Sequence, residues 1–422
     1  MQSIVGLVAV SGLGYVLSFA KNLVIAGIFG AGKETDALFV TMGLPEVLFF
    51  AVNGAVYLSL VTLYNREMEA GRAAAAARLA GATVNLVFVG GAILGAASYM
   101  GAPYLVWVLA PGFPLETQEL TVRLIRLTSF SFAFVGVWST LTALANARER
   151  FFVPALIHNI PNAVIIGGLL VLSSSWGIGV AAGGYTVGYA VAVILLVTWI
   201  FWRREARLDF RAGLSPGVLY PVVALSVPFV AASLLNKLMI TVSRFFASYL
   251  PEGSVAILTF AYVPVNFVHN VLTVSFLTVL FARLTVIAGR GEADRVGELV
   301  DRAARHIAIL MIPAGVFLAV LAEPVIRLVF ERGAFGAEAT TEAAWTLMFY
   351  APEMVALGWL SLFLRASFAR GEVYLYLKAM VAAFLVNAGL GALLGPKLGV
   401  AGLALALVLA TFVGCGLLYR WM

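Results

Sequence analysis

Long runs of apolar residues, separated by short polar segments, dominate the pattern along this chain. A helix that crosses a bilayer needs about 20 mostly apolar residues. The runs are too long, and alternate too little, for the strands of an outer-membrane barrel. The pattern therefore predicts twelve membrane-spanning helices, at Ile4–Gly30, Asp36–Tyr64, Leu79–Met100, Thr121–Asn146, Val153–Leu172, Gly179–Trp202, Val218–Leu250, Val255–Ile287, His306–Ala322, Ala343–Phe368, Val373–Leu394 and Gly399–Arg420.

The composition agrees with this pattern and excludes several classes of protein. The 422-residue chain is 62% hydrophobic and only 11% charged, whereas soluble proteins are roughly 45–50% apolar and about 25% charged. A soluble fold could not hide so much apolar surface, because ordinary folds already expose a largely apolar surface. We therefore expect an all-α polytopic membrane protein, not a cytoplasmic enzyme, a secreted domain or a disordered chain.

The positions of Lys and Arg predict the orientation of the helices, because cytoplasmic loops carry an excess of these residues. Most of them lie in or beside loops that follow even-numbered spans: Arg66, Arg72, Arg78, Arg148, Arg150, Arg203, Arg204, Arg207, Arg211, Arg283, Arg290, Arg295, Arg302, Arg305, Arg365, Arg370 and Lys378. Loops after odd-numbered spans hold little more than Lys33, Arg123, Arg327, Arg332 and Lys397. Both termini are therefore predicted to be cytoplasmic. Contact with anionic lipid then explains the net charge of +6 without a nucleic-acid partner.

Few residues point to the chemistry of an enzyme or a metal site. The single cysteine, Cys415, excludes an internal disulfide and a cysteine metal cluster. The histidines are scattered, and no Ser/His/Asp array favours hydrolysis. The polar segment Gly289–Arg305 has the pattern of an amphipathic helix on the cytoplasmic face. We therefore expect a transporter that has no cofactor.

Two stretches about 220 residues apart look alike, which predicts an internal repeat. Each has an aromatic residue after a turn of small residues, an acidic helix start with Thr, an Ala-Arg loop, and Gly-Val-Ala before the next helix. The matching pairs are Leu105–Thr121 and Val325–Thr341, Ala143–Pro154 and Leu364–Leu375, and Gly177–Gly184 and Lys397–Ala404.

This offset divides the predicted helices into two lobes of six. Because an even number of helices returns the chain to the same side, the lobes are predicted to be parallel repeats related by a pseudo-two-fold axis along the membrane normal. We expect an N-terminal six-helix lobe at residues 1–205, a cytoplasmic linker at 206–217 and a C-terminal six-helix lobe at 218–422. Two such lobes are expected to enclose a cavity near the midplane and to rock against each other.

Five segments carry a resemblance to a known family. They are FGAGKETDALFVTMGLPEVL at Phe29–Leu48, LAPGF at Leu109–Phe113, LANARERFFVPALIHNIPN at Leu144–Asn162, FASYLPEGSVAILTFAY at Phe246–Tyr262 and LVFERGAFGAEAT at Leu328–Thr340. In this order they resemble helix ends and loops of the MurJ lipid II flippases, in the multidrug/oligosaccharidyl-lipid/polysaccharide (MOP) exporter superfamily. The resemblance covers essentially the whole chain and implies the MOP flippase fold in the bacterial cytoplasmic (inner) membrane. The family usually has fourteen helices, so its final pair is expected to be absent here.

The resemblance implies a flippase that moves an undecaprenyl-pyrophosphate-linked saccharide, such as lipid II, from the cytoplasmic to the outer leaflet. Such a protein has to shield a polar headgroup and a diphosphate across about 30 Å of hydrocarbon. A buried diphosphate without partners is prohibitively costly, so the cavity should carry cations. Candidates for the driving force are the membrane potential, H⁺ and Na⁺. Membrane lipids and cell-envelope glycosyltransferases are candidate partners.

The cavity positions depart from the family pattern. By the resemblance, the family's charged positions correspond here to Tyr15, Lys21 and Asn22 in the first helix and to Phe49, Phe50 and Asn53 in the second. In the eighth helix the family's Ala-Asp-Arg corresponds to Ala261, Tyr262 and Val263. New cations appear in the seventh helix at Lys237 and Arg244, which are two helical turns apart and share a face. The family's cationic cavity is thus expected to be partly dismantled and partly relocated.

Eight residues are candidates for contact with the substrate. Lys21, Lys237 and Arg244 form a candidate cation cluster for the phosphates; the alternative is that Lys21 and Arg244 snorkel toward an interface. The polar candidates are Asn22, Asn53, Asn266, His269 and Asn270. The last three follow a proline in the eighth helix, which frees backbone groups that can line a cavity for sugar hydroxyls. Hydrogen bonds between helices are the alternative role.

Four further residues are candidates for gating or ion coupling: Asp36, Glu46, Glu353 and Asn387. Asp36 stands at the start of the second helix, where it either caps that helix or takes part in gating. Glu46 is either the counter-ion of a candidate lysine or a proton-coupled switch. Glu353 is a buried-carboxylate candidate in the tenth helix. By resemblance, Asn387 occupies a family position near a cation site.

Two other functions fit the same sequence. A cation-coupled drug or small-molecule antiporter of the superfamily would rely on buried carboxylates, and Glu46 and Glu353 are available for that role. A non-transporting scaffold of a cell-envelope synthesis complex would account for the missing family arginines. Movement of a labelled lipid-linked sugar, or its absence together with co-purification of a glycosyltransferase, separates these functions from a flippase.

Overall fold

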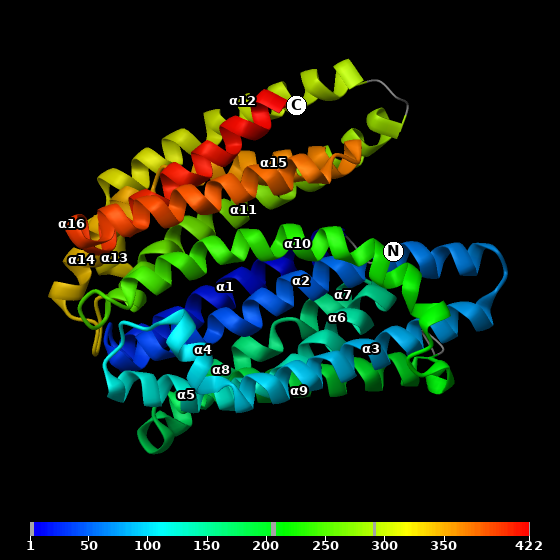
Figure 1. The fold of residues 1–422 in the computed structure, drawn as a ribbon, viewed down its shortest axis with the longest axis horizontal. Coiled ribbons are helices and arrows are strands. Elements are labelled where there is room, and N and C mark those ends of the chain that lie inside the picture. Colours follow the sequence, from blue (N-terminus) through cyan, green and yellow to red (C-terminus); the bar gives the residue numbers. More distant parts are fainter. Residues whose placement is uncertain (1–3, 204–207, 290–292, 422) are drawn as a thin grey trace. The chain divides into compact units, whose positions relative to one another are not determined.

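The computed structural model describes residues 4–203, 208–289 and 293–421. Every regular element in these residues is helical, with no strand among them. The first half contains α1 (Ile4–Phe29), α2 (Lys33–Glu69), α3 (Ala73–Met100), α4 (Ala102–Leu109), α5 (Leu115–Ser129), α6 (Ser131–Ala147), α7 (Phe152–Ile157), α8 (Ile160–Trp176) and α9 (Gly179–Trp202), as Figure 1 shows.

The second half begins after a single 3₁₀ turn, η1 (Phe210–Ala212). Its helices are α10 (Pro216–Ala247), α11 (Ser254–Gly289), α12 (Ala293–Val320), α13 (Ala322–Phe330), α14 (Ala337–Tyr350), α15 (Glu353–Arg370) and α16 (Val373–Trp421). The predicted all-α class is therefore confirmed.

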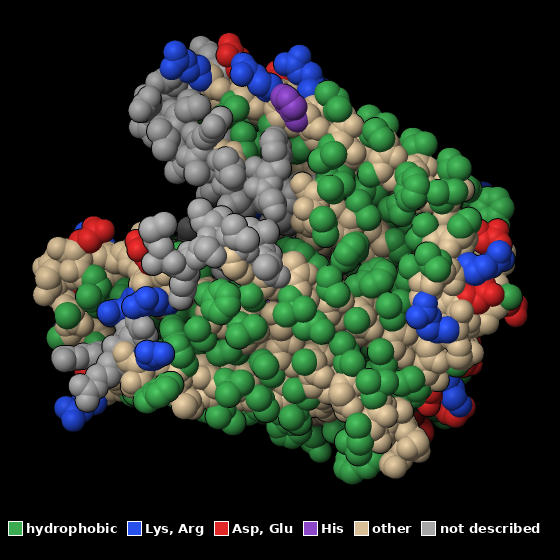
Figure 2. Space-filling model, turned by 180° about the vertical axis from the view of Figure 1, so that it is seen from behind, with side chains coloured by type: hydrophobic (Ala, Val, Ile, Leu, Met, Phe, Trp, Pro, Cys, Tyr) green, Lys and Arg blue, Asp and Glu red, His purple; other side chains and the backbone are tan. Residues whose placement is uncertain are grey.

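Hydropathy and helix length together make this a membrane-spanning fold. Within the described residues, 8 helices are long and apolar enough to cross a membrane, or up to 9 if α14 and α15, bent by 46° at their junction, count as one span. Figure 2 shows hydrophobic side chains over most of the visible face, with charged side chains gathered along its margins. The polytopic membrane class is thus confirmed, whereas the count of twelve spans remains a prediction.

The longest helix, α16, is broken at Gly399. Its 49 residues would extend about 74 Å at 1.5 Å per residue, more than twice the ~30 Å thickness of the hydrocarbon core. Gly399 has φ 60° and ψ −141°, which is not a helical conformation. The break separates the last two predicted spans, Val373–Leu394 and Gly399–Arg420. Each half then has a length suited to crossing the hydrocarbon core once.

Several features recur in the two halves of the chain. The short helices α4 and α13 each follow a long span, and α5 and α14, which come next, begin at Leu115 and Ala337. Gly177, before α9, has φ 55° and ψ −147°, close to the values of Gly399. These correspondences support the repeat of two six-helix lobes, which itself remains a prediction.

By packing, the chain divides into two compact units. Unit 1 comprises Met1–Val24, Val40–Trp107 and Leu115–Leu234. Unit 2 comprises Ile25–Phe39, Val108–Pro114 and Leu235–Met422. The turn between α1 and α2 therefore belongs to unit 2, although it lies near the start of the sequence. The lobe boundaries predicted at 1–205 and 218–422 remain a prediction.

Small residues allow the helices of unit 1 to approach closely. A Cβ added to Gly188 in α9 would overlap Pro161 in α8, and one added to Gly91 in α3 would overlap the backbone of α6 at Ala133. Close backbone approach is a main source of helix association in lipid, where hydrophobic burial between helices is weak. The glycines thus fix α8 against α9 and α3 against α6.

The polar segment predicted as an amphipathic helix at Gly289–Arg305 is not a separate element. Its residues from Ala293 onward form the first turns of α12 and continue into the predicted ninth span. Val296, Val300 and Ile307 are buried along one face of this helix. The apolar stripe of the amphipathic part is continuous with the apolar span, so one helix includes both, with Pro313 in its interior.

Replacing Gly399 with Ala is expected to destabilise the protein by about 1–3 kcal/mol, because this backbone conformation is essentially restricted to glycine. Gly389→Ala is the control, since Gly389 is helical in α16 and a Cβ there would meet open space. The control should be neutral or stabilising by roughly 0.5–1 kcal/mol. Thermal unfolding in detergent measures both. Equal stability of the two variants would contradict strain at Gly399.

Candidate functional site

Asp36 lies at the centre of a hydrogen-bonded cluster in unit 2. Its carboxylate accepts a hydrogen bond from the backbone N–H of Ala256 at 2.7 Å and one from that of Gly253, also at 2.7 Å. The side chain is buried, with 2% of its surface exposed. The first N–H groups of a helix lack partners within that helix and favour negative charge. Asp36 therefore caps α11, rather than its own helix α2 as one reading of the sequence expected.

Three further contacts hold the turn between α1 and α2. The backbone N–H of Lys33 donates to Glu252 Oε1 at 2.8 Å, and the backbone N–H of Ala334 donates to the Gly27 carbonyl at 2.9 Å. A guanidinium nitrogen of Arg244 donates to the carbonyl of Phe39 at 2.8 Å. We call this set of contacts, together with those of Asp36, the α1–α2 latch.

Two glycines allow the latch to form. Gly253 has φ +94° and Gly333 has φ +57°, both in the region that favours glycine. A Cβ on Gly253 would lie 2.8 Å from the carbonyl oxygen of Ala31, and one on Gly333 would overlap the carbonyl of Gly27. The backbone of the turn can approach these loops only because neither loop has a side chain at these positions.

Aromatic rings support the latch from within unit 2. Phe260 of α11 meets Phe39 edge-on, with ring centroids 5.2 Å apart. The same ring contacts Phe330 at 5.2 Å and Phe335 at 5.5 Å. All four rings are buried. The carboxylate of Asp36 therefore binds α11 close to an apolar cluster.

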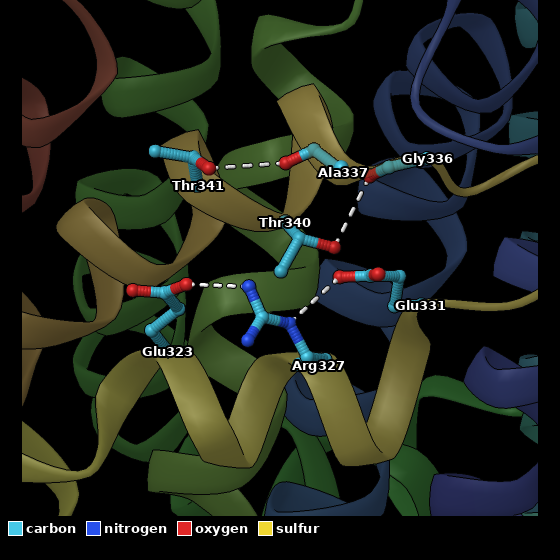
Figure 3. A network of polar contacts seen from close by, with 7 residues as sticks. All are labelled: Glu323, Arg327, Glu331, Gly336, Ala337, Thr340 and Thr341. Atoms are coloured by element: carbon cyan, nitrogen blue, oxygen red, sulfur yellow. Dashed lines mark hydrogen bonds and ion pairs between the residues drawn. The ribbon is translucent and has the colours of Figure 1, made fainter.

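The charged network on α13 is a surface feature. Arg327 donates to Glu323 at 2.6 Å and to Glu331 at 3.3 Å, while Thr340 and Thr341 donate to backbone carbonyls of their own helix start, as Figure 3 shows. The Arg327 side chain is 58% exposed. Exposed ion pairs contribute little to stability, so this network adds little to the stability of the fold.

The two candidate cations of α10 have different surroundings. Lys237 and Arg244 both lie in unit 2 and are half-buried. Arg244 donates to the Phe39 carbonyl and is therefore part of the latch. That hydrogen bond gives it a structural role that the sequence did not suggest, and its contact with phosphate stays a prediction.

Lys21 lies in unit 1 near a carboxylate and two tyrosines. The charge of Glu46 acts on Lys21 and on the buried side chains of Tyr185 and Tyr189. The two tyrosine rings, one helical turn apart on α9, have centroids 4.9 Å apart. The role of Glu46 as the counter-ion of Lys21 stays a prediction. Sequence reasoning missed the tyrosines, whose only signal was their spacing of four in GYTVGY.

The remaining polar candidates do not converge on one cavity. Asn22 donates to the Ser18 carbonyl of its own helix at 3.0 Å, and the side chain of Asn53 lies outside the described residues. On α11, Asn270 donates to the carbonyl and side chain of Asn266, which is exposed. His269 points instead into the protein and is 7% exposed.

A buried carboxylate stands at the junction of α14 and α15 in unit 2. Glu353 is 2% exposed, and its Oε1 accepts a hydrogen bond from the Thr411 hydroxyl at 2.9 Å. Its Oε2 has no hydrogen-bond partner within the described part of the chain. The Glu353 charge acts on Tyr262 and Tyr350, whose ring centroids lie 5.2 Å apart.

Asn387, the fourth gating candidate, ties two helices together. Its side-chain amide donates to the Met239 carbonyl of α10 at 2.8 Å, and it is 1% exposed. Over the described residues no group of three or more His, Cys, Asp and Glu side chains could hold a metal ion. Asn387 therefore joins α16 to α10, and its place near a cation site stays a prediction.

The membrane-spanning helices define a polytopic membrane protein. Among solved structures, the chain is similar to "Lipid II flippase MurJ, inward closed conformation", with TM-score 0.84 and 23% identity over 99% of this chain and 87% of that one. It is also similar to the inward-facing conformation of a multidrug resistance MATE family transporter of the MOP superfamily, with TM-score 0.79 and 12% identity over 97% and 93%. These likenesses show the MOP fold.

Comparison of the amino-acid sequence with known families shows the family of this protein. The family model "Lipid II flippase MurJ" matches residues 25–422, and the chain belongs to this family of lipid II flippases. Probable lipid II flippases MurJ from Rhizobium meliloti (strain 1021) and Thermotoga maritima are 26% and 28% identical to it, over 96% and 94% of this chain and 77% and 80% of the relatives. The resemblance seen in the sequence is confirmed, as is a multi-pass protein of the bacterial inner membrane.

Asp36→Ala is expected to speed the exchange of backbone amide hydrogens at the start of α11, because two charge-assisted hydrogen bonds are lost. Each such bond contributes about 1.5–3 kcal/mol, so amide exchange at Gly253 and Ala256 should accelerate roughly tenfold or more. Hydrogen–deuterium exchange with mass spectrometry measures this. Glu34→Ala, in the same turn of α2 but outside the latch, is the control. Unchanged exchange in Asp36→Ala would show that the carboxylate does not hold α11.

Proposed function

We propose that this protein moves lipid II, or a related undecaprenyl-pyrophosphate-linked saccharide, from the cytoplasmic to the outer leaflet by alternating access. The family match over residues 25–422 carries this proposal. The names of the curated relatives, which cover nearly the whole chain, support it. The fold supports it too, because a transporter needs only to bind and shield its cargo, and no catalytic array is required.

We propose further that both termini face the cytoplasm. The concentration of Lys and Arg in loops after even-numbered predicted spans supports this orientation. The α1–α2 latch then lies at the outer side of the membrane. Within unit 2 it fastens the ends of α1 and α2 to the start of α11, so release of Asp36 is a step that opening to the outer side requires.

Lys237 and Lys21 are the cations that we assign to the diphosphate. Arginine or lysine inside the membrane is expensive and is a site hypothesis by default. Lys237 is half-buried on α10 and Lys21 is half-buried on α1. Because Arg244 is engaged by the Phe39 carbonyl, it reaches phosphate only when the latch opens. This arrangement would link binding of the headgroup to gating.

The polar residues have supporting roles in this proposal. Asn266 and Asn270 would hold sugar hydroxyls, with His269 behind them on α11. Asn22 and Asn53 are assigned to the same headgroup. Cell-envelope glycosyltransferases, which make or consume such a lipid, are the proposed protein partners.

Coupling to an ion is the last part of the proposal. Of the candidates for coupling, Glu353 is the one with a buried oxygen that has no hydrogen-bond partner in the described residues. We assign a transported proton to Glu353, at the bend between α14 and α15. Glu46 is assigned to charge balance with Lys21, and Asn387 to helix pairing. Membrane potential and Na⁺ are the alternative driving forces.

Lys237→Ala and Lys21→Ala are expected to slow translocation of a labelled lipid-linked sugar in proteoliposomes. Loss of one charge-assisted contact with phosphate corresponds to roughly a tenfold lower rate or more. Lys378→Ala is the matched control, since Lys378 is exposed and lies over the Tyr374 ring. Normal rates in both lysine variants would remove the cation assignment. Failure of the wild type to move any lipid, with a co-purifying glycosyltransferase, would favour a scaffold.

Glu353→Gln is expected to abolish the response of transport to an imposed pH gradient while leaving transport at equal pH on both sides. Gln keeps the size of the side chain and an acceptor for Thr411, but it cannot release a proton. The assay is translocation in proteoliposomes with and without a gradient. Glu342→Gln, at an exposed position of α14, is the control. A variant that still responds to the gradient would show that the proton does not use Glu353.

A further inference from the structure

A slot opens between three helices of unit 2. The helices α12, α15 and α16 lie side by side (Figure 1), and α15 packs against both others. The slot between them has a volume of about 470 Å³, within the range of roughly 300–1,000 Å³ typical of ligand pockets. Its lining includes Arg305, Trp359, Phe363, Phe412, Gly416 and Tyr419. None of these residues belongs to the transport roles proposed above.

The floor of the slot is apolar and already formed. Phe363 and Cys415 are each 2% exposed, and Cys415 gives its S–H to the Ala356 carbonyl. The Trp359 ring is fixed because its Nε1–H donates to the Ala304 carbonyl at 3.0 Å. The Phe412 ring meets the Trp359 ring edge-on, with their centroids 6.1 Å apart. A saccharide would find few polar partners on this floor, whereas a hydrocarbon chain would fit it.

The mouth of the slot is charged. Arg305 and Asp301 line it, one helical turn apart on α12, and both are exposed. Within the part of the chain that the structure describes, Arg305 forms no ion pair. Tyr419 lines the same mouth, and Trp421 follows it at the end of α16. Tyr and Trp are enriched where spanning helices meet the headgroup layer, so the mouth lies at headgroup level.

We propose that this slot binds one anionic phospholipid, with an acyl chain against Phe363, Phe412 and Gly416 and the phosphate on Arg305. A guanidinium pairs with phosphate through two parallel hydrogen bonds. Clusters of Arg at the end of a spanning helix attract anionic lipid, and Arg302 lies beside Arg305 on α12. The proposal concerns a resident lipid and holds whatever cargo the protein moves.

Gly416 offers a direct way to fill the slot. A Cβ added there would meet nothing within 4 Å, so a larger side chain enters the slot without a clash with protein. Gly389 is an equally open glycine on the same helix but does not line the slot. Gly416→Leu therefore removes the volume for an acyl chain, and Gly389→Leu is its matched control.

The experiment titrates delipidated full-length protein in detergent with phosphatidylglycerol or phosphatidylcholine and counts bound lipids by native mass spectrometry. The wild type and Gly389→Leu should retain one phosphatidylglycerol, and Gly416→Leu should lose it. Arg305→Gln should weaken the binding of phosphatidylglycerol roughly tenfold or more but leave the binding of phosphatidylcholine unchanged. Arg302→Gln should weaken the binding of phosphatidylglycerol less. Brominated phosphatidylglycerol should quench tryptophan fluorescence in the wild type but not in Gly416→Leu. That difference would place the acyl chain of the lipid beside Trp359.

Several results would overturn the proposal. One is that folded Gly416→Leu binds phosphatidylglycerol with wild-type affinity. Another is that the wild type and Arg305→Gln each bind phosphatidylglycerol no more tightly than phosphatidylcholine. Loss of a co-purifying protein, instead of a lipid, from Gly416→Leu would identify the slot as a protein interface and reject the lipid. Because every readout is binding, these results do not depend on whether the protein proves to be a flippase.

Discussion

The carboxylate of Asp36, set at the first turn of α11, is the interaction on which the arrangement of unit 2 depends. It joins residues 217 and 220 positions apart. Buried N–H groups at a helix start have no water to satisfy them in a membrane protein and need a partner from the protein. Asp36 supplies both acceptors at once. The hydrogen bonds of Lys33 and Arg244 extend the same contact along the turn.

Because charged residues are scarce in this protein, the surroundings of those inside the helices are informative. Lys21 has Glu46 nearby in unit 1, Arg244 has a backbone carbonyl, and Asn387 joins α16 to α10. Glu353 differs from these, because one of its oxygens has no hydrogen-bond partner in the described residues. Buried polar groups are normally satisfied. Among the four gating or coupling candidates, Glu353 has such an unsatisfied oxygen in the described residues, which is why we propose it as the proton site.

The sequence predicted the elements well, because a helix in lipid must satisfy its own backbone and therefore appears as an apolar run. The break before the last span follows from Gly399, and the membrane class follows from composition. The partner of Asp36 could not be predicted, since no periodicity links residues so far apart. The role of Arg244 was missed for the same reason: its partner is a backbone carbonyl of another helix, which leaves no mark on the side-chain pattern.

The departures of this chain from its family bear on cargo more than on conformational change. By the resemblance seen in the sequence, positions where the family carries arginines correspond to Tyr15, Phe49 and Phe50, whereas Asp36 of the latch is retained. The hydrogen bonds of the latch join protein groups of α2 and α11, so the latch itself depends on no feature of the cargo. The number and position of the cations that bind the cargo instead have to match the charge of its headgroup. Within the function that we propose, Lys21 and Lys237 take over from the family's arginines, and the retained latch favours a transporter of an anionic headgroup over a protein that no longer transports.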